Sequence, residues 1–153
     1  MSESETATRT RTAEETEAVG ERLAATLSRS DVIYLVGDLG AGKTTLARGL
    51  ARGLGAETRE VASPTFALLN EYAAARPGPA QRGIVLRHLD LYRLADDPRD
   101  LAILGLPDAV ADAPVCVEWP GEAIRRLLPP TVEITIVPEP DDLRRIRVRR
   151  IRG

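Results

Sequence analysis

Two patterns of apolar residues organise the chain and predict its elements. A run of five apolar residues, Val32–Val36, is typical of a strand that is buried on both faces of a parallel sheet. Shortly after it, leucines recur at four-residue intervals over residues 44–54, which predicts a helix that Gly55 ends. The first predicted unit of the fold is therefore a strand, a short loop and a helix.

Similar patterns on both sides of this unit predict further elements. Upstream, Thr12–Glu15 is a capping box that opens an amphipathic helix. Downstream, we expect strands in a run that ends at Tyr72 and over residues 84–90, 115–118, 132–137 and 143–151, a surface loop over 73–83, a broken helix over 96–111, a short helix after Gly121 and a turn over 138–142. This order predicts an α/β fold with a mainly parallel central sheet, flanking helices and antiparallel strands at the edges.

Length and charge narrow the class of protein. The chain has 153 residues, which predicts one domain, and its 21 basic and 23 acidic residues leave a net charge of −2, so no overall field favours nucleic acid or a membrane. No apolar stretch approaches the ~20 residues of a membrane span, and we expect a cytoplasmic protein. Residues 1–11 are rich in Ser, Thr and Glu and predict a flexible segment ahead of a domain over residues 12–153. The lone Cys116 lies in an apolar run, which predicts a buried, unreactive thiol.

The loop between the first strand and its helix carries the clearest chemistry. Gly37–Thr44 fills every fixed position of the phosphate-loop pattern G-x-x-x-x-G-K-[ST]. Lys43 is the only lysine among 21 basic residues, and a compact ammonium group suits a position between β- and γ-phosphates better than a planar guanidinium does. The glycines let backbone N–H groups face an anion, and Thr44 offers a hydroxyl to Mg²⁺. The sequence therefore predicts a nucleoside triphosphate site.

Two predicted strands end in a carboxylate, Asp90 and Glu118. Because the carboxyl ends of parallel strands meet at the ligand-binding edge of a sheet, both side chains are expected near the phosphate loop. Mg²⁺ keeps several waters, so one carboxylate would hold the metal shell and the other would orient the attacking water. We assign Glu118 to the metal and Asp90 to the water. Neither strand end has an adjacent Asp–Glu pair, and we expect slow intrinsic hydrolysis.

Three further features are open to both a structural and a functional interpretation. Ser63–Phe66 is either a loop that senses the γ-phosphate or a plain turn. Trp119 is either a core residue or a contact for a base or a partner. His88 is expected to be a structural hydrogen-bonding group rather than a catalyst.

Four motifs occur together in the order that is typical of one known family. They are Gly37–Thr45, Ser63–Phe66 with Asn70–Tyr72, His88–Arg93 and Glu118–Pro120. Over nearly the whole chain from Thr12, this set resembles the TsaE (YjeE) family, the ATPases of threonylcarbamoyladenosine formation in tRNA. The resemblance implies a single-domain P-loop fold, ATP and Mg²⁺ as cofactors, weak ATPase activity alone, and action with TsaD and TsaB on adenosine 37 of ANN-decoding tRNAs.

The resemblance also implies which residues form the site. Lys43, Asp90 and Glu118 would be catalytic, Thr44 and Glu118 would serve the metal, and the nucleotide would be bound by Asp38, Leu39, Gly40, Ala41, Gly42, Lys43, Thr44 and Thr45. Ser63–Phe66 would be the nucleotide-responsive loop, and Thr12 or Thr16 would lie near the adenine. One departure is Gly121, where the family commonly has an acidic residue, so Glu122 would have to take over a partner contact there.

Other classes of protein remain for comparison. A Ras-like GTPase is excluded, because its Asn-Lys-x-Asp motif needs a lysine besides Lys43. A P-loop small-molecule kinase would use Asp90 toward an acceptor hydroxyl, under a lid for which Arg93 and Arg99 are candidates. A nucleotide-gated assembly factor without a tRNA role is the other alternative. We expect a monomer when the protein is alone.

The last predicted strand is rich in arginine. Six arginines interleave with apolar residues; they are Arg144, Arg145, Arg147, Arg149, Arg150 and Arg152. This alternation is typical of an edge strand that buries one face and uses charge to resist unwanted pairing. The alternative is a weak or indirect contact of the arginines with tRNA, or a contact with an acidic partner surface.

Overall fold

The described residues form one mixed sheet with helices on both faces. The structure is a computed structural model that describes residues 3–57, 69–76, 83–92, 99 and 112–151. The strands in these ranges are β1 (Glu3–Thr10), β2 (Val32–Val36), β3 (Leu69–Ala73), β4 (Ile84–Asp90), β5 (Val115–Glu118), β6 (Val132–Glu139) and β7 (Leu143–Ile151). The helices are α1 (Ala13–Ala24), α2 (Lys43–Gly53) and α5 (Glu122–Leu127).

The sheet has a parallel centre. Its strand order, for the part of the chain that the structure describes, is β1-β7-β6-β2-β5-β4-β3. The strands β4, β5, β2 and β6 run parallel, while β3, β7 and β1 pair antiparallel with their neighbours. The predicted α/β class is confirmed. Because β2 lies in the parallel centre, both of its faces are buried, which explains its uninterrupted run of apolar residues.

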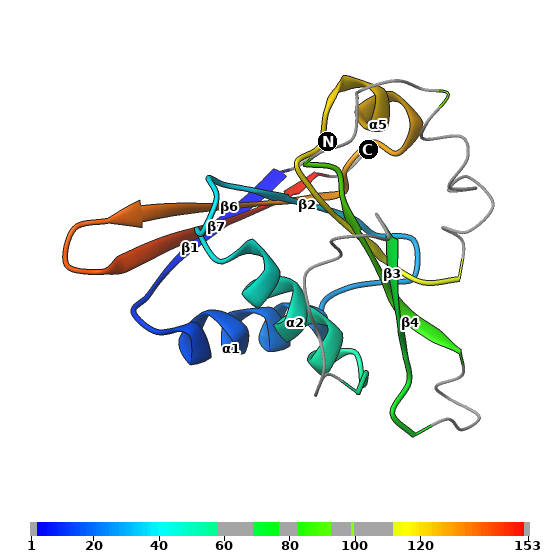
Figure 1. The fold of residues 1–153 in the computed structure, drawn as a ribbon, viewed down its shortest axis with the longest axis horizontal. Helices are drawn as coiled ribbons and strands as arrows, with labels where there is room; N and C mark the ends of the chain where they lie inside the picture. The colour runs from blue at the N-terminus through cyan, green and yellow to red at the C-terminus, as the bar shows by residue number, and fades with distance from the viewer. Residues whose placement is uncertain (1–2, 58–68, 77–82, 93–98, 100–111, 152–153) are drawn as a thin grey trace.

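The helices divide the core into two layers. Figure 1 shows α1 and α2 together on one face of the sheet and α5 on the other. On the first face, Leu46 and Leu50 of α2 share a buried cluster with Leu35 of β2. On the second face, Ile124 of α5 shares a cluster with Tyr34. Successive residues of β2 thus enter opposite cores, as the pleat of a strand requires.

Glycines bring α1 and α2 into close contact. A Cβ atom on Gly49 would lie 2.1 Å from the Glu17 carbonyl oxygen, and one on Gly20 would lie 2.5 Å from the Leu46 carbonyl oxygen. Only a hydrogen atom fits at these distances, so the two backbones touch. The contact places the first turn of α1 beside the start of α2, where the phosphate loop ends.

Residues 3–10 correct the prediction of a flexible segment over residues 1–11. They form β1, which pairs antiparallel with β7 from Glu3↔Ile151 to Thr10↔Arg144. The hydroxyls of Thr10 and Thr16 share a buried hydrogen bond of 2.8 Å, which ties β1 to α1. Residues 4–9 are exposed, so the backbone ladder holds this strand and no apolar pattern announces it.

Most other predicted elements coincide with observed ones. The strands β2, β4 and β5 begin and end at the predicted residues, and Thr12 caps α1 by accepting a hydrogen bond from the Glu15 N–H at 3.1 Å. β6 continues to Glu139 instead of ending at Val137, so the turn to β7 is shorter than predicted. β7 lies between β1 and β6, so the edge-strand explanation of its arginines is wrong. No helix in the described ranges is long and apolar enough to cross a membrane.

Candidate functional site

The phosphate loop connects the end of β2 to the start of α2. Gly40 and Gly42 have φ angles of +77° and +114°, which residues with a side chain rarely adopt. Gly42 is also the N-cap residue of α2, so the helix begins at Lys43 without a side-chain cap. Backbone N–H groups at such a helix start attract anions. The local backbone is therefore suited to the nucleotide contacts predicted for residues 38–45.

Lys43 is held inside the site. Only 5% of the residue is exposed, its Nζ donates to the Gly37 carbonyl at 2.6 Å, and the same atom lies 3.4 Å from the centroid of the Trp119 ring. Burial lowers the pKa of Lys43, and nearby carboxylates, Glu118 foremost, oppose this shift. The charge of Lys43 is therefore costly where it lies, and an anionic ligand would stabilise it.

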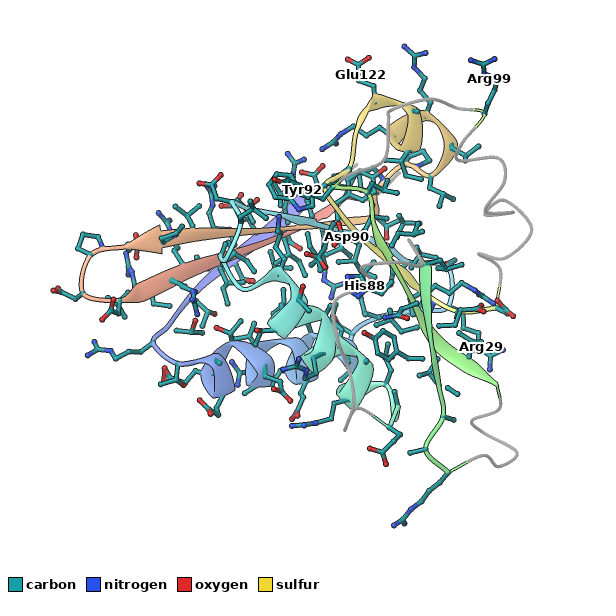
Figure 2. All side chains as sticks on the ribbon, in the orientation of Figure 1. Arg29, His88, Asp90, Tyr92, Arg99 and Glu122 are labelled. Carbon is teal, nitrogen blue, oxygen red and sulfur yellow. The ribbon has the colours of Figure 1, made fainter. Side chains whose placement is uncertain are left out.

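The two strand-end carboxylates lie side by side. Asp90 and Glu118 are register partners in the parallel strands β4 and β5, and β5 is a direct neighbour of β2. The Thr44 hydroxyl donates to Glu118 Oε2 at 3.2 Å. Glu118 is buried, whereas Asp90 is half-buried at the end of β4 (Figure 2). The structure thus brings both predicted carboxylates to the phosphate loop and joins Glu118 to Thr44.

His88 lies against Glu118. It is fully buried, and its Nε2 donates to Glu118 Oε2 at 2.5 Å. Its ring stacks on that of Tyr72, with 6.4 Å between the centroids. Its Nδ1 has no hydrogen-bond partner among the described residues, so within them the histidine bonds to Glu118 alone. The predicted hydrogen-bonding group is observed, its partner is a predicted site residue, and its structural rather than catalytic role stays a prediction.

Trp119 faces the site instead of the core. Its φ angle of +59° turns the chain at the end of β5, and its half-buried ring lies against Lys43 and 4.8 Å from the centroid of Tyr92. The interpretation as a core residue is therefore wrong. A contact with a base or a partner stays a prediction. Cys116, in contrast, is fully buried, and burial raises the pKa of its thiol, as predicted for an unreactive cysteine.

These groups surround a pocket of about 330 Å³. Its wall includes the predicted residues Lys43, Thr44, Asp90 and Glu118, together with three residues that the sequence analysis did not assign to the site: Ala13, Tyr92 and Arg144. A second hollow of about 300 Å³ lies beside the first and shares Lys43 and Trp119 with it. Lys43 and the Trp119 ring therefore separate the two hollows.

Comparison with known proteins identifies the family. A family model described as "Threonylcarbamoyl adenosine biosynthesis protein TsaE" matches residues 10–146. The chain belongs to the TsaE family. The resemblance expected from the four motifs is thereby confirmed.

Individual relatives agree with this membership in the TsaE family. A Bacillus subtilis protein named "tRNA threonylcarbamoyladenosine biosynthesis protein TsaE" is 41% identical over 140 residues, which cover 90% of this chain and 81% of the relative. A Haemophilus influenzae protein of the same name is 40% identical over 118 residues, 76% of this chain and 68% of the relative. The crystal structure of Bacillus subtilis YdiB matches with a TM-score of 0.71 and 31% identity, over 99% of this chain and 89% of that one.

The oxygen donors of this TsaE family member fit a magnesium ion. Within the described ranges, no group of three or more His, Cys, Asp or Glu side chains forms a metal cluster. The Thr44 hydroxyl lies 3.2 Å and 3.5 Å from the two carboxylate oxygens of Glu118. Mg²⁺ binds through one or two such protein groups, with waters and substrate phosphates as its other ligands. The pair therefore suits a metal that arrives with a nucleotide.

The pattern of β7 contained a signal for one missed residue. Arg144 lies two residues before Ile146 and four before Val148, both of which are buried in the core beneath α1 and α2. Side chains two apart in a strand share a face, so Arg144 faces the same layer as the phosphate loop. For Tyr92, which follows Asp90 outside the strand, no comparable pattern exists.

The other arginines of β7 lie mostly on the opposite face. Arg147 pairs with Glu5 at 2.6 Å and Arg149 with Glu133 at 2.8 Å. The proposed tRNA or partner contact of this face stays a prediction, and its charges are largely paired within the sheet.

Several sequence predictions lie outside the described residues. These are Ser63–Phe66, Arg93, Arg152, the helix over 96–111 apart from residue 99, and part of the loop over 73–83. Arg99 is described, and Figure 2 shows it well apart from Asp90 and Tyr92. Arg99, the one described residue among the two candidates for a kinase lid, therefore does not line the pocket.

Proposed function

We propose that this chain is the ATP-binding and ATP-hydrolysing component of the machinery that forms N6-threonylcarbamoyladenosine at position 37 of ANN-decoding tRNAs. The observation that carries the proposal is the hydrogen bond between Thr44 and Glu118, because it sets a hydroxyl and a strand-end carboxylate beside the buried Lys43. Membership of the TsaE family, whose relatives are named for threonylcarbamoyladenosine biosynthesis, supports the pathway.

The phosphate loop would bind the nucleotide. Its backbone N–H groups cradle the phosphates, and Lys43 leaves the ring of Trp119 for the β- and γ-phosphates. The move of Lys43 from the ring to the phosphates favours ATP binding, because burial destabilises the positive charge of Lys43 and a phosphate would stabilise it. Thr44 and Glu118 would hold Mg²⁺, which would neutralise part of the phosphate charge when bound.

Asp90 would orient the attacking water. It lies beside Glu118 in the register of the sheet and lines the pocket wall. Its Oδ1 accepts a hydrogen bond from the Tyr92 N–H at 3.0 Å, which fixes the orientation of the carboxylate. Glu118 is hydrogen-bonded to Thr44, whose hydroxyl is the predicted metal ligand of the phosphate loop. This contact supports the assignment of Glu118 to the metal and leaves Asp90 for the water.

The partner subunits TsaD and TsaB would act at the mouth of the pocket. Leu39 is 67% exposed and Tyr92 is 47% exposed, and both line the pocket. Exposed apolar side chains beside a site favour a protein surface that closes over it. Closure would exclude bulk water and complete the catalytic group, so the chain alone hydrolyses ATP slowly.

The rate of ATP hydrolysis tests the proposal. It is measured for the chain alone, with candidate small metabolites, and with the TsaD–TsaB pair. We expect slow hydrolysis alone and stimulation by the pair only, with Glu118→Gln lowering the stimulated rate at a low Mg²⁺ concentration. Phosphate transfer to a metabolite would instead identify a small-molecule kinase. Tighter partner binding with ATP but no faster hydrolysis would identify a nucleotide-gated assembly factor.

A further inference from the structure

Arg144 reaches the phosphate loop from β7. Because β6 runs parallel to β2, the turn from β6 to β7 lies at the same edge of the sheet as the phosphate loop. Arg144 is the second residue of β7, and its Nη2 lies 3.5 Å from the Gly40 carbonyl oxygen. Its Cδ lies 3.8 Å from the place that a Cβ atom on Gly42 would take. The guanidinium therefore lies along the rim of the loop.

Among the described residues, no carboxylate pairs with the charge of Arg144. In the described part of the chain it forms no ion pair, whereas Arg147 and Arg149 of the same strand each pair with a glutamate. Its contact with Gly40 is at the long limit of a hydrogen bond and engages one of five guanidinium N–H donors. Arg144 is half-buried in the wall of the pocket that also contains Lys43. It is a second cation beside an anion-binding loop.

The sheet order shows which end of the pocket Arg144 occupies. β5 and β4, which carry Glu118 and Asp90, lie on one side of β2, and β6 and β7 lie on the other. Lys43 and Thr44 contact the groups on the carboxylate side, which is the end for the terminal phosphates. Arg144 therefore borders the opposite end, where the α-phosphate and the nucleoside would lie.

We propose that Arg144 binds the α-phosphate of the nucleotide. The inference rests on the proposed function, since it assumes that a nucleotide occupies this pocket. A guanidinium presents parallel N–H donors that match two phosphate oxygens, and the rim of the loop brings them to the phosphates rather than to the base. Lys43 then serves the β- and γ-phosphates, of which ADP lacks the γ-phosphate, while Arg144 serves the α-phosphate that ATP and ADP share.

Calorimetric titration with ATP and with ADP tests the proposal. Arg144→Ala is expected to weaken both nucleotides by the same factor, about tenfold or more, the scale of a lost charge-assisted hydrogen bond. Arg144→Lys is expected to keep part of the affinity, because it keeps the charge but loses the parallel N–H donors. The matched control is Arg145→Ala, which removes the adjacent arginine on the opposite face of β7 and is expected to bind both nucleotides as the parent does.

Each other outcome overturns the inference in a recognisable way. Equal affinities of Arg144→Ala and Arg145→Ala would remove Arg144 from the site. A loss confined to ATP would move its contact to the γ-phosphate, and an Arg144→Lys variant as weak as Arg144→Ala would replace phosphate binding by stacking on the base. If neither the parent nor Arg145→Ala bound a nucleotide, the proposed function itself would fail. Thermal melts of both alanine variants establish that each is folded.

Discussion

At the scale of single residues, Lys43 shows a conflict between binding and stability. Burial lowers its pKa from 10.5 because the folded chain must desolvate its charge. At neutral pH this charge is a penalty that the unfolded chain does not bear, and the penalty disappears as the pH rises to the usual lysine value. The group that would bind phosphate is thus one that weakens the fold itself.

Replacing Lys43 by Met tests this conflict. We expect ATP binding to weaken by at least ~2 kcal/mol, the value of a charge-assisted contact, and the midpoint of thermal unfolding at neutral pH to rise. The gain in stability should shrink toward alkaline pH, where the lysine of the parent protein is neutral in both states. Calorimetry and thermal melts over a pH series measure the two effects.

Lys43→Arg is the control for the Met variant. It keeps a positive charge but carries a larger, planar head in a place where the ammonium lies 3.4 Å from a ring centroid. We expect it to bind ATP as poorly as Lys43→Met does. Binding at the affinity of the parent protein would contradict the steric argument for a lysine here.

The two carboxylates are separable by magnesium titration. Glu118→Gln should raise the Mg²⁺ concentration for half-maximal activity, because it weakens the oxygen pair with Thr44. Asp90→Asn should lower turnover and leave ATP affinity largely intact. The reverse pattern would exchange the two roles, and no effect from either variant would place both residues outside the site.

His88 is expected to act through Glu118. His88→Ala would release a carboxylate oxygen that is now bonded at 2.5 Å, and the affinity for Mg²⁺ should fall about tenfold, as for other partners of metal-binding side chains. His88→Gln can offer an amide N–H near the position of Nε2 and should recover part of the loss. Mg²⁺-dependent nucleotide binding measures this. Equal Mg²⁺ affinity in His88→Ala and the parent protein would leave the histidine a purely structural residue.

The predictability of single residues depended on whether the pattern was local. The phosphate loop and the two strand-end carboxylates were predicted, because each is recognised from a motif of consecutive residues. The contact of Trp119 with Lys43 was not, since it joins residues from β5 and α2 and depends on a positive φ angle that no residue type announces. Arg144 was missed although it shares a strand face with the buried Ile146 and Val148, because a run of arginines is usually interpreted as a solvent-exposed surface.

At the scale of elements, α1 packs closely on α2, which begins where the phosphate loop ends. Gly49→Ala would place a methyl group 2.1 Å from the Glu17 carbonyl oxygen, and backbone cannot yield as a flexible side chain can. We expect the free energy of unfolding to fall by about 3 kcal/mol, the upper range for overpacking. Chemical denaturation measures this loss, and ATP affinity should fall with it because the helices would separate near the loop.

Arg52→Ala is the matched control on α2. Arg52 pairs with Glu17 at 2.5 Å and is about half exposed, so its removal should cost less than ~1 kcal/mol. A loss for Gly49→Ala no larger than this would mean that α1 and α2 can shift apart freely.

Elements with an apolar pattern were predicted well, and the one without it was missed. The strands β2, β4 and β5 have the predicted bounds because their burial enforces the pattern. β1 is mostly exposed and is held by backbone hydrogen bonds to β7, together with the buried bond between Thr10 and Thr16. Backbone pairing leaves no trace in side-chain composition, so residues 3–10 were predicted to be flexible.

At the scale of the whole molecule, the class of fold was predictable and the strand order was not. Parallel and antiparallel strands follow from the order of elements along the chain, whereas neighbours in the sheet depend on contacts between distant segments. The sequence therefore placed the arginines of β7 on an edge strand, although β1 covers that edge.

The face that carries these arginines has a specific test. The side chains of Arg147 and Arg149 are 46% and 42% exposed, so changing both to Gln should lower the free energy of unfolding by less than ~1 kcal/mol per pair. ATP binding should not change, because the pocket is on the other side of the sheet. If the predicted tRNA or partner contact exists, the double variant should weaken tRNA association or stimulation by TsaD–TsaB. Unaltered values of both would leave these arginines a structural role only.

The pairing of β1 with β7 also bears on the stage of protein synthesis at which the pocket can form. Arg147 and Glu5, which meet across these strands, are 142 positions apart in the chain. The ribosome makes β1 before β7, so β1 stays without this partner until β7 has been synthesised, and closing so long a loop has an entropic cost. Arg144, which pairs with Thr10 at one end of this ladder, lines the same pocket as Ala13, the first residue of α1. The phosphate loop, which lies between β2 and α2, is therefore synthesised well before Arg144 completes the wall of the pocket.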